Sequence, residues 1–304
     1  MTDSAKNPRK LLVIADDYGI GFNTTTGILQ LAARGVITGS AFLVNTGDAA
    51  ESIQRWRRLG CPVELGWHPN LTLDAPIAPA SQIPSLVQPD GQFWPLGQFL
   101  KRWMLGKPDP AEIELELKLQ LRRFIDFVGH PPTFVNFHQH LALFKPVGEI
   151  LLSLLSELRV RPYVRRVQEP WSMLWKVRGA WIKRFALNKL GRATAAMQVR
   201  HGFPGNDWLA GISNPGMIAH PHFFLNWLRT MPGDVVELMC HPGLHDPTLV
   251  GRDCTADDGM LGQRVNEMRW LLDPTFLDVV AEAGFRLTTA SQLLFGELAQ
   301  VRCS

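Results

Sequence analysis

The sequence is poor in cysteine and contains no long apolar run. Its 304 residues include four cysteines, and none forms the Cys-x-x-Cys pair of a zinc ribbon or a dithiol redox site. No apolar segment approaches the roughly 20 residues that cross a bilayer, and residues 1–10 are polar, unlike a secretory signal. We therefore expect a cytoplasmic protein with reduced thiols.

The sequence also has little excess charge and only two tyrosines. Its net charge is +3 and it carries no nucleic-acid-binding motif, so we expect no nucleic acid partner. Ten tryptophans stand against the two tyrosines, and tryptophan is favoured where an apolar surface meets water, as in ligand grooves and at membrane interfaces. The 46% hydrophobic and 19% charged residues are typical of a globular protein with a substantial core.

The most informative stretch is an apolar run that ends in two carboxylates. Residues 11–15 predict a buried strand, and Asp16 and Asp17 follow at its carboxyl end, where α/β proteins place their chemistry. Neighbouring strand residues point to opposite faces, so one carboxylate can hold a metal while the other moves a proton. The alternative is a loop in which the two residues cap the next helix.

Three further predicted strands end in histidine. His68 follows residues 63–67, His138 and His140 follow residues 133–137, and His241 follows residues 235–240. Helical patterns lie between these runs, which indicates an α/β fold with parallel strands. A lone histidine is more often structural, but a parallel barrel gathers its strand ends at one face, so four such ends together indicate a site.

The chemistry of these residues is consistent with metal-assisted hydrolysis. Two histidines and one carboxylate are the usual protein ligands of a catalytic divalent metal, which lowers the pKa of its bound water. A second aspartate can accept a proton from that water, and a further histidine can protonate a leaving group.

Five motifs in this order resemble the YdjC/ChbG-like carbohydrate deacetylases, a family that includes a hopanoid-associated branch. They lie at residues 15–19, 35–45, 66–72, 136–140 and 237–243, and Arg264 and Glu267 match a final Arg-x-x-Glu element. The resemblance implies a single domain over residues 1–304, folded as an irregular TIM-like (β/α) barrel related to the polysaccharide deacetylases. It also implies removal of acetyl from N-acetylated amino sugars with one divalent metal, zinc or magnesium.

The resemblance also implies roles for individual residues. Asp17, His68 and His138 would be the metal ligands. Asp16 would be the general base, and His241 the general acid that also stabilises the developing oxyanion. The remaining matched residues, with substrate-binding or supporting roles, are His140, Asn70, Tyr18, Arg264 and Glu267.

Three of these assignments keep alternatives. His140 could replace His138 as a ligand, because Leu141, Ala142 and Leu143 follow it where the family often has a third histidine. Arg264 could orient Asp16 or a substrate group, or lie on a helix surface. Tyr18 stands where phenylalanine is commoner.

Two segments depart from the strand–helix alternation. Residues 74–110 are rich in proline, glycine and aromatics and predict a loop-rich excursion that forms a binding wall or lid. Residues 159–201 carry eleven lysines and arginines against the single acid Glu169, with Trp171, Trp175 and Trp181 mixed in. Trp171, Trp175, Val177 or Arg178, Ile182 and Phe185 fall close to helical spacing. They predict either a solvated basic helix pair or an interfacial segment that contacts anionic membrane lipids from the cytoplasmic side.

The substrate stays open between three alternatives. A lipid-linked, hopanoid-type N-acetylglucosaminyl compound suits an interfacial segment, and residues 205–211 resemble the hopanoid-associated branch. A soluble chito-oligosaccharide suits residues 237–243, which are closer to the chito-oligosaccharide branch. A catalytically silent carbohydrate- or lipid-binding protein is the third alternative, although loss of activity usually removes one of the predicted site residues.

Overall fold

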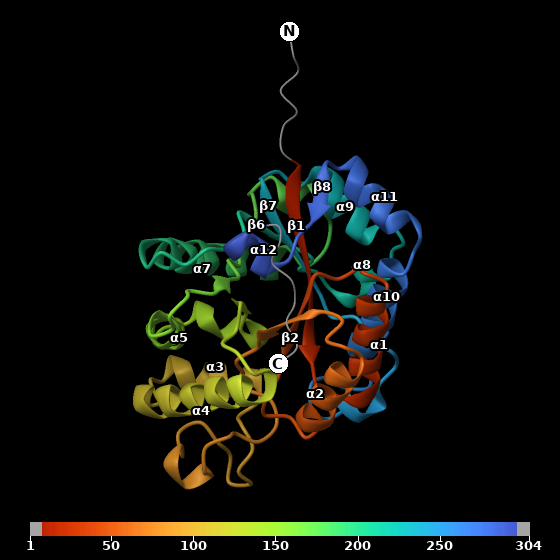
Figure 1. The fold of residues 1–304 in the computed structure, drawn as a ribbon. Helices are drawn as coiled ribbons and strands as arrows, with labels where there is room; N and C mark the ends of the chain where they lie inside the picture. Colours follow the sequence, from red (N-terminus) through yellow and green to blue (C-terminus); the bar gives the residue numbers. More distant parts are fainter. Residues whose placement is uncertain (1–7, 297–304) are drawn as a thin grey trace.

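A computed structural model describes residues 8–296 as a curled sheet of parallel strands surrounded by helices (Figure 1). The strand order is β5-β4-β3-β2-β1-β7-β6, and β8 pairs with the start of β1. Every strand pair is parallel. The strands are β1 (Arg9–Tyr18), β2 (Gly39–Phe42), β3 (Glu64–Trp67), β4 (Phe134–Val135), β5 (Tyr163–Val164), β6 (Trp208–Ala210), β7 (Val235–Cys240) and β8 (Phe285–Leu287).

Helices connect the strands and cover the outside of the sheet. In Figure 1, α1, α2 and α10 lie to the right of the sheet, and α4, α5 and α7 lie to the left. The α-helices are α1 (Phe22–Ala33), α2 (Ala49–Arg58), α3 (Leu96–Met104), α4 (Pro110–Val128), α5 (Val147–Ser156), α6 (Met173–Lys176), α7 (Trp181–Arg200), α8 (Pro215–Ile218), α9 (Phe223–Thr230), α10 (Met260–Leu271), α11 (Thr275–Glu282) and α12 (Ala290–Phe295). Short 3₁₀ helices are η1 (Ala80–Gln82), η2 (His138–Leu143) and η3 (Pro247–Leu249). The predicted α/β fold, an irregular parallel barrel, is confirmed.

Alternation along β1 separates the two faces of the sheet. Leu11 and Val13 pack with the helices in the main core, whereas Leu12 and Ile14 pack inside the curled sheet with Phe134. Asp16 continues the inward-facing series of Leu12 and Ile14. The strand pattern therefore places the first carboxylate at the carboxyl end of the barrel interior.

The two irregular segments contain elements of their own. Residues 74–110 include η1, a short antiparallel bridge between Val87 and Phe93, and α3. The Glu116 carboxylate on α4 accepts the backbone N–H groups of Ile77 and Ala78 at 2.9 and 2.8 Å, which fixes the start of this excursion. Residues 159–201 contain β5, α6 and α7.

No helix within residues 8–296 is long and apolar enough to cross a membrane. Cys240 and Cys254 are buried free thiols. Cys303 lies outside the described residues.

Candidate metal and catalytic site

The carboxyl ends of neighbouring parallel strands bring the expected residues together. β1 ends at Asp16 and Asp17, β3 is followed by His68, β4 by His138, and β7 by His241. Asp16, Asp17, His68 and His138 are almost completely buried, while the His241 side chain is 25% exposed. His241 is therefore the member of this group that a substrate can reach from solvent.

The backbone at Asp17 departs from the alternation predicted for a regular strand. Asp17 has a φ of 68°, and the pairing of β1 with β2 shifts register between Ala15 and Tyr18. A left-handed aspartate at a strand bulge is uncommon, and such a conformation persists where the surrounding contacts hold it. The two carboxylates nevertheless belong to one connected group of polar side chains, because Asn136 donates to Asp16 and also contacts His68, which lies beside Asp17. Neither caps α1, whose first N–H groups bond instead to the Asp246 carboxylate.

Asp17, His68 and His138 form a compact set of possible metal ligands. Their donor atoms all lie within 4.8 Å of one another. Asp17 Oδ1 lies 3.3 Å from His68 Nε2 and 3.1 Å from His138 Nδ1. Ligand bonds of about 2.0–2.2 Å around a tetrahedral ion put neighbouring donor atoms roughly 3.3–3.6 Å apart, which is close to this spacing.

Asn136 fixes the orientation of His68. His68 Nδ1 lies 2.9 Å from the Asn136 backbone carbonyl oxygen and also contacts the Asn136 side-chain oxygen. Two oxygen acceptors require the proton to be on Nδ1, so Nε2 presents its lone pair toward Asp17. Metal-binding histidines are commonly oriented in this way by a backbone carbonyl on the other ring nitrogen.

The charges around the set favour a divalent cation. Arg165 pairs with Asp16 and Glu237, and Arg264 pairs with Asp17 and Asp253. Four carboxylates thus share two guanidinium groups in a buried region. The residues present therefore fit a bound divalent ion.

Arg165 holds Asp16 with two hydrogen bonds. Its Nη1 and Nη2 donate to Asp16 Oδ2 and Oδ1 at 2.5 and 2.8 Å, and its Nε donates to Glu237 Oε1 at 2.5 Å. The Asn136 amide also donates to Asp16 Oδ1, at 2.9 Å. Burial opposes ionisation of Asp16, but the charge and hydrogen bonds of Arg165 lower its pKa to about 2. Asp16 is therefore ionised at neutral pH and fixed in position.

His241 faces Asp16 across the open side of the site. Its Nε2 lies 3.9 Å from Asp16 Oδ2. Burial lowers the pKa of His241, against the opposing effect of the two aspartates, so the imidazole is neutral at pH 7. The Glu267 carboxylate accepts the backbone N–H of His241, and burial raises the pKa of Glu267 to about 7. Glu267 thus supports the loop that carries His241.

Arg264 is buried on α10 and belongs to the site. Its Nη2 donates to Asp17 Oδ2 at 2.7 Å and to Asp253 Oδ2 at 2.8 Å. Burial raises the pKa of Asp17 on its own, but the charge of Arg264 helps to hold it well below its usual value. The alternatives of a surface arginine and of an arginine that orients Asp16 are both wrong, because Arg264 is buried and contacts Asp17.

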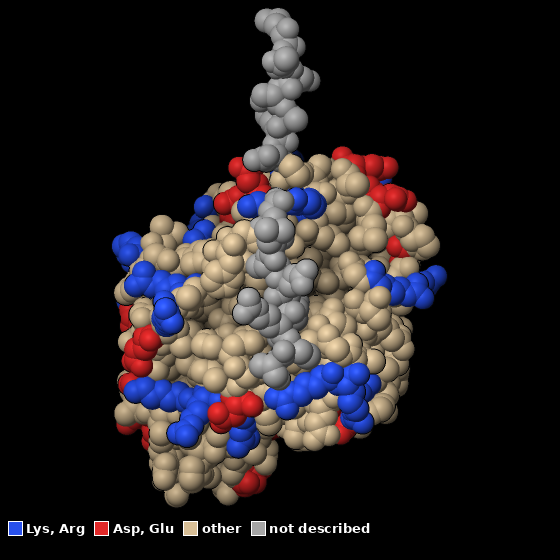
Figure 2. Space-filling model, in the orientation of Figure 1, with Lys and Arg blue, Asp and Glu red and all other residues tan. Residues whose placement is uncertain are grey.

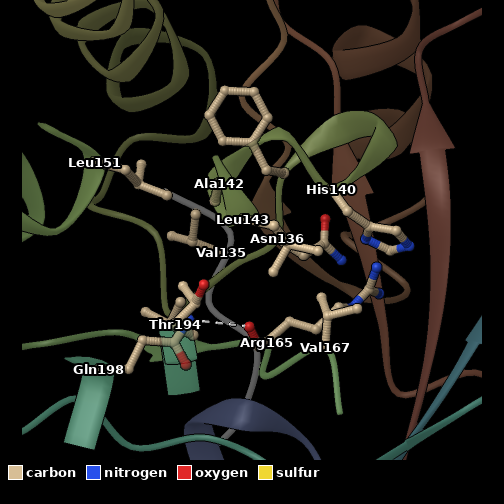
Figure 3. A pocket seen from close by; sticks show the side chains of 12 residues that line it. Val135, Asn136, His140, Ala142, Leu143, Leu151, Arg165, Val167, Thr194 and Gln198 are labelled. Carbon is tan, nitrogen blue, oxygen red and sulfur yellow. Dashed lines mark hydrogen bonds between the residues drawn. The ribbon is translucent and has the colours of Figure 1, made fainter. Parts of the chain in front are cut away.

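His140 lies beside the site but outside the ligand set. It follows His138 in a left-handed turn, with a φ of 57°, and lines a small cavity next to Arg165 and Asn136 (Figure 3). Burial, reinforced by the charges of Arg165 and Lys183, lowers the pKa of His140 well below its usual value. The structure therefore brings His138 rather than His140 next to Asp17.

Comparison with known proteins assigns the family. A family model described as YdjC-like protein matches residues 10–282. The chain belongs to the YdjC-like family. It is 31% identical over 300 residues to a mouse carbohydrate deacetylase, covering 93% of this chain and 94% of the relative. It is 26% identical over 290 residues to a chitooligosaccharide deacetylase of Klebsiella pneumoniae, covering 92% and 98%.

A solved structure shares the fold of this YdjC-like chain. An Enterococcus faecalis protein named as a cellobiose-phosphate cleavage protein superposes with a TM-score of 0.71 at 22% identity. The match covers 95% of this chain and all of the other one. The two chains therefore share the same fold.

Asn70 of this YdjC-like protein supports the site, whereas the Tyr18 hydroxyl is directed away from it. The Asn70 amide donates to Asn45 Oδ1 and the Leu73 carbonyl oxygen at 3.1 and 2.8 Å, and its oxygen accepts the Thr72 N–H at 2.9 Å. These bonds fix the loop after His68. The buried Tyr18 hydroxyl donates to the Ser52 carbonyl oxygen at 2.8 Å, away from the ligand set.

Sequence reasoning missed three residues of the site as functional candidates. Arg165 follows β5 and obeys the same strand-end pattern, but β5 is only two residues long, so the run preceding Arg165 gives no strand signal. Asn136 lies within a matched motif, yet an amide carries no chemical signal of its own. Asp253 lies in a loop after η3 and faces His138 Nε2 at 3.8 Å, and no pattern in the sequence points to it.

Proposed function

We propose that this YdjC-like protein removes acetyl from an N-acetylated amino sugar and that it depends on one divalent metal ion. The observation that carries the proposal is the buried Asp17–His68–His138 set placed beside the ionised Asp16 and the accessible His241. The names of its relatives, carbohydrate deacetylase and chitooligosaccharide deacetylase, support the same substrate class.

In this proposal Asp17, His68 and His138 hold the ion. When bound, the ion, zinc or magnesium, supplies Lewis acidity that polarises the acetamide carbonyl and acidifies the attacking water. Arg264 keeps Asp17 ionised, and Asn136 keeps the His68 lone pair directed at the ion. The protein residues thus fix the ligand geometry before the substrate binds.

Asp16 and His241 divide the proton transfers. Water adds to the acetyl carbon and gives up a proton to the Asp16 carboxylate, which Arg165 holds in place. Because Arg165 makes Asp16 a weak base, the proton passes readily to the neutral His241 Nε2, 3.9 Å away. The imidazolium then protonates the sugar nitrogen as the C–N bond breaks, which yields acetate and the free amine.

The amino-sugar substrate has two candidates. Relatives named as chitooligosaccharide deacetylases favour a soluble oligosaccharide. Exposed tryptophans on α6 and α7 favour a lipid-linked, hopanoid-type N-acetylglucosaminyl compound, which a cytoplasmic enzyme would meet at the inner membrane face. We infer no nucleic acid partner.

Acetate release from a panel of free and lipid-linked N-acetylglucosaminyl compounds tests the proposal. With added metal we expect release by the wild-type protein, loss in Asp16→Asn and His241→Ala, and retention in Tyr18→Phe. Near-normal activity in folded Asp16→Asn and His241→Ala would refute the assigned roles. A wild-type chain that neither binds a divalent ion nor releases acetate would favour the alternative of a silent binding protein.

A further inference from the structure

Helix α7 buries a largely polar face and exposes apolar side chains to solvent. Its buried face is largely polar and includes Arg184, Asn188, Thr194 and Gln198. On its solvent side, Trp181, Ile182 and Phe185 are exposed by 65%, 67% and 48%. A surface helix of a globular protein normally turns its apolar side inward, so this arrangement needs a separate explanation.

Two tryptophans extend the exposed apolar surface beyond α7. Trp175 on α6 is 87% exposed, and Trp171 packs against Phe185 with ring centroids 5.6 Å apart. We call Trp171, Trp175, Trp181, Ile182 and Phe185 together the α6–α7 patch. Scattered single apolar residues are normal at a surface, but a contiguous aromatic patch marks an interaction site.

The patch is held rigidly in its exposed position. Arg184, on the buried face of α7, donates to Glu169 Oε1 and Oε2 at 3.0 and 2.7 Å. It also donates to the Met173 carbonyl oxygen at 2.7 Å and to the Val177 carbonyl oxygen at 2.5 Å. These bonds tie α6 to α7, and turning the apolar side inward would break them. The exposure is therefore a property of the folded protein.

The exposed charged side chains of α6, α7 and the turn between them are all of one sign. Lys176, Arg178, Lys183 and Lys189 are exposed cations of α6, α7 and the turn between them. Glu169 is the single acid of residues 159–201, and Arg184 neutralises it. Figure 2 shows lysine and arginine side chains at the left edge of the molecule, where Figure 1 places α7. A second copy of this chain would bring like charges together, whereas an anionic surface would complement them.

The patch also lies next to the active site. α7 packs against η2, which carries His138 and His140. Lys183 lies in the first turn of α7, so the basic side chains of the patch belong to the same helix that contacts η2. A surface that docks through the patch would therefore lie beside the His140 side of the site.

We propose that the α6–α7 patch docks this protein on the surface of an anionic lipid bilayer. The aromatic and aliphatic side chains insert at the level of the lipid head groups, and the surrounding lysines pair with anionic head groups. The inference concerns binding only, so it stands or falls independently of the proposed deacetylation.

Vesicle flotation with the full-length chain tests the proposal. We expect binding to phosphatidylcholine vesicles that contain about 30% phosphatidylserine, and weak binding to pure phosphatidylcholine. Trp181→Ser with Ile182→Ser should weaken binding at least tenfold, since two inserted side chains are lost. Lys176→Glu with Lys189→Glu should also weaken it at least tenfold, and added salt should weaken wild-type binding.

The matched control is Met104→Ser with Leu105→Ser, which removes two exposed apolar side chains at the end of α3. It should bind vesicles as the wild type does. Circular dichroism and thermal unfolding should be the same for all variants, since each substituted side chain is exposed. Absence of wild-type binding, or equal loss in the α3 control, would overturn the proposal. So would a concentration-dependent dimer that only the Trp181→Ser, Ile182→Ser variant abolishes.

Discussion

Replacement of Arg165 by methionine tests whether the Asp16 carboxylate is fixed as described. Arg165 makes two hydrogen bonds to Asp16 and one to Glu237, all buried. Methionine fills a similar volume but leaves two buried carboxylates without their cation. Removing one partner of a buried ion pair costs about 3–5 kcal/mol, so we expect a loss of that size in the free energy of unfolding at pH 7.

The pH dependence of the loss identifies its cause. A native pKa of about 2 for Asp16, against about 3.9 in the unfolded chain, contributes about 2.5 kcal/mol of stability. The native pKa is lowered, so this contribution is complete above pH 4 and disappears as the pH falls toward 2. In the variant the pKa of Asp16 rises above 3.9, and protonation at pH 4 relieves the unpaired charge. The difference between wild type and variant should therefore be larger at pH 7 than at pH 4.

Arg166→Met is the matched control for this measurement. Arg166 is the neighbouring arginine, and its guanidinium donates to the backbone carbonyl oxygens of Phe203 and Asn206 at 3.0 and 3.4 Å, away from the site. We expect it to cost about 1 kcal/mol and to leave acetate release nearly unchanged. Arg165→Met should lower kcat by roughly 10²–10⁴-fold, the usual contribution of a positioned proton acceptor.

Urea unfolding at pH 7 and pH 4 gives both stabilities, and acetate release gives kcat. Arg165→Lys should fall between wild type and Arg165→Met, since it retains the charge but cannot bind both carboxylate oxygens. The reasoning is refuted if Arg165→Met lies within about 1 kcal/mol of Arg166→Met at pH 7, or if the difference is the same at both pH values.

Three other predictions concern the supporting residues. Asn136→Leu should weaken binding of added metal roughly 10–100-fold by freeing the His68 ring, and unchanged affinity in calorimetry would contradict this. Burial raises the native pKa of Glu267 to about 7, so Glu267 stabilises the folded state most below pH 4.5, and this stabilisation declines as the pH rises to 7. The free energy of unfolding of Glu267→Gln should therefore depend less on pH than that of the wild type. Parallel pH profiles for the two proteins would contradict this prediction. Tyr18→Phe should lose about 1 kcal/mol of stability with kcat unchanged, whereas a large fall in kcat would place Tyr18 in the chemistry.

The sequence predicted the parallel fold and the convergence of Asp16, Asp17, His68, His138 and His241. It did so because apolar runs that end in polar residues are visible locally, and because parallel strands all deliver their carboxyl ends to one edge. The left-handed conformation of Asp17 could not be predicted, since the bulge is held by contacts with residues far along the chain.

Other features depend on tertiary packing that a pattern does not contain. The near-helical spacing within residues 171–185 does not belong to one continuous helix, because α6 ends at Lys176 and Gly179 and Ala180 adopt positive φ values before α7 begins. The buried face of α7 is polar because Arg184 donates hydrogen bonds to the Glu169 carboxylate and to the Met173 carbonyl oxygen of α6. Arg165 belongs to the basic segment 159–201 in the sequence, but its side chain is buried at the centre of the site, where it pairs with Asp16 and Glu237.

The central claim is that one divalent ion binds to Asp17, His68 and His138. Titration calorimetry of chelator-treated protein with zinc or magnesium tests it directly. We expect one ion per wild-type chain, loss of that binding in His68→Ala, and its retention in His140→Ala. Absence of binding by the wild type, or equal binding by His68→Ala, would show that these residues do not hold the ion.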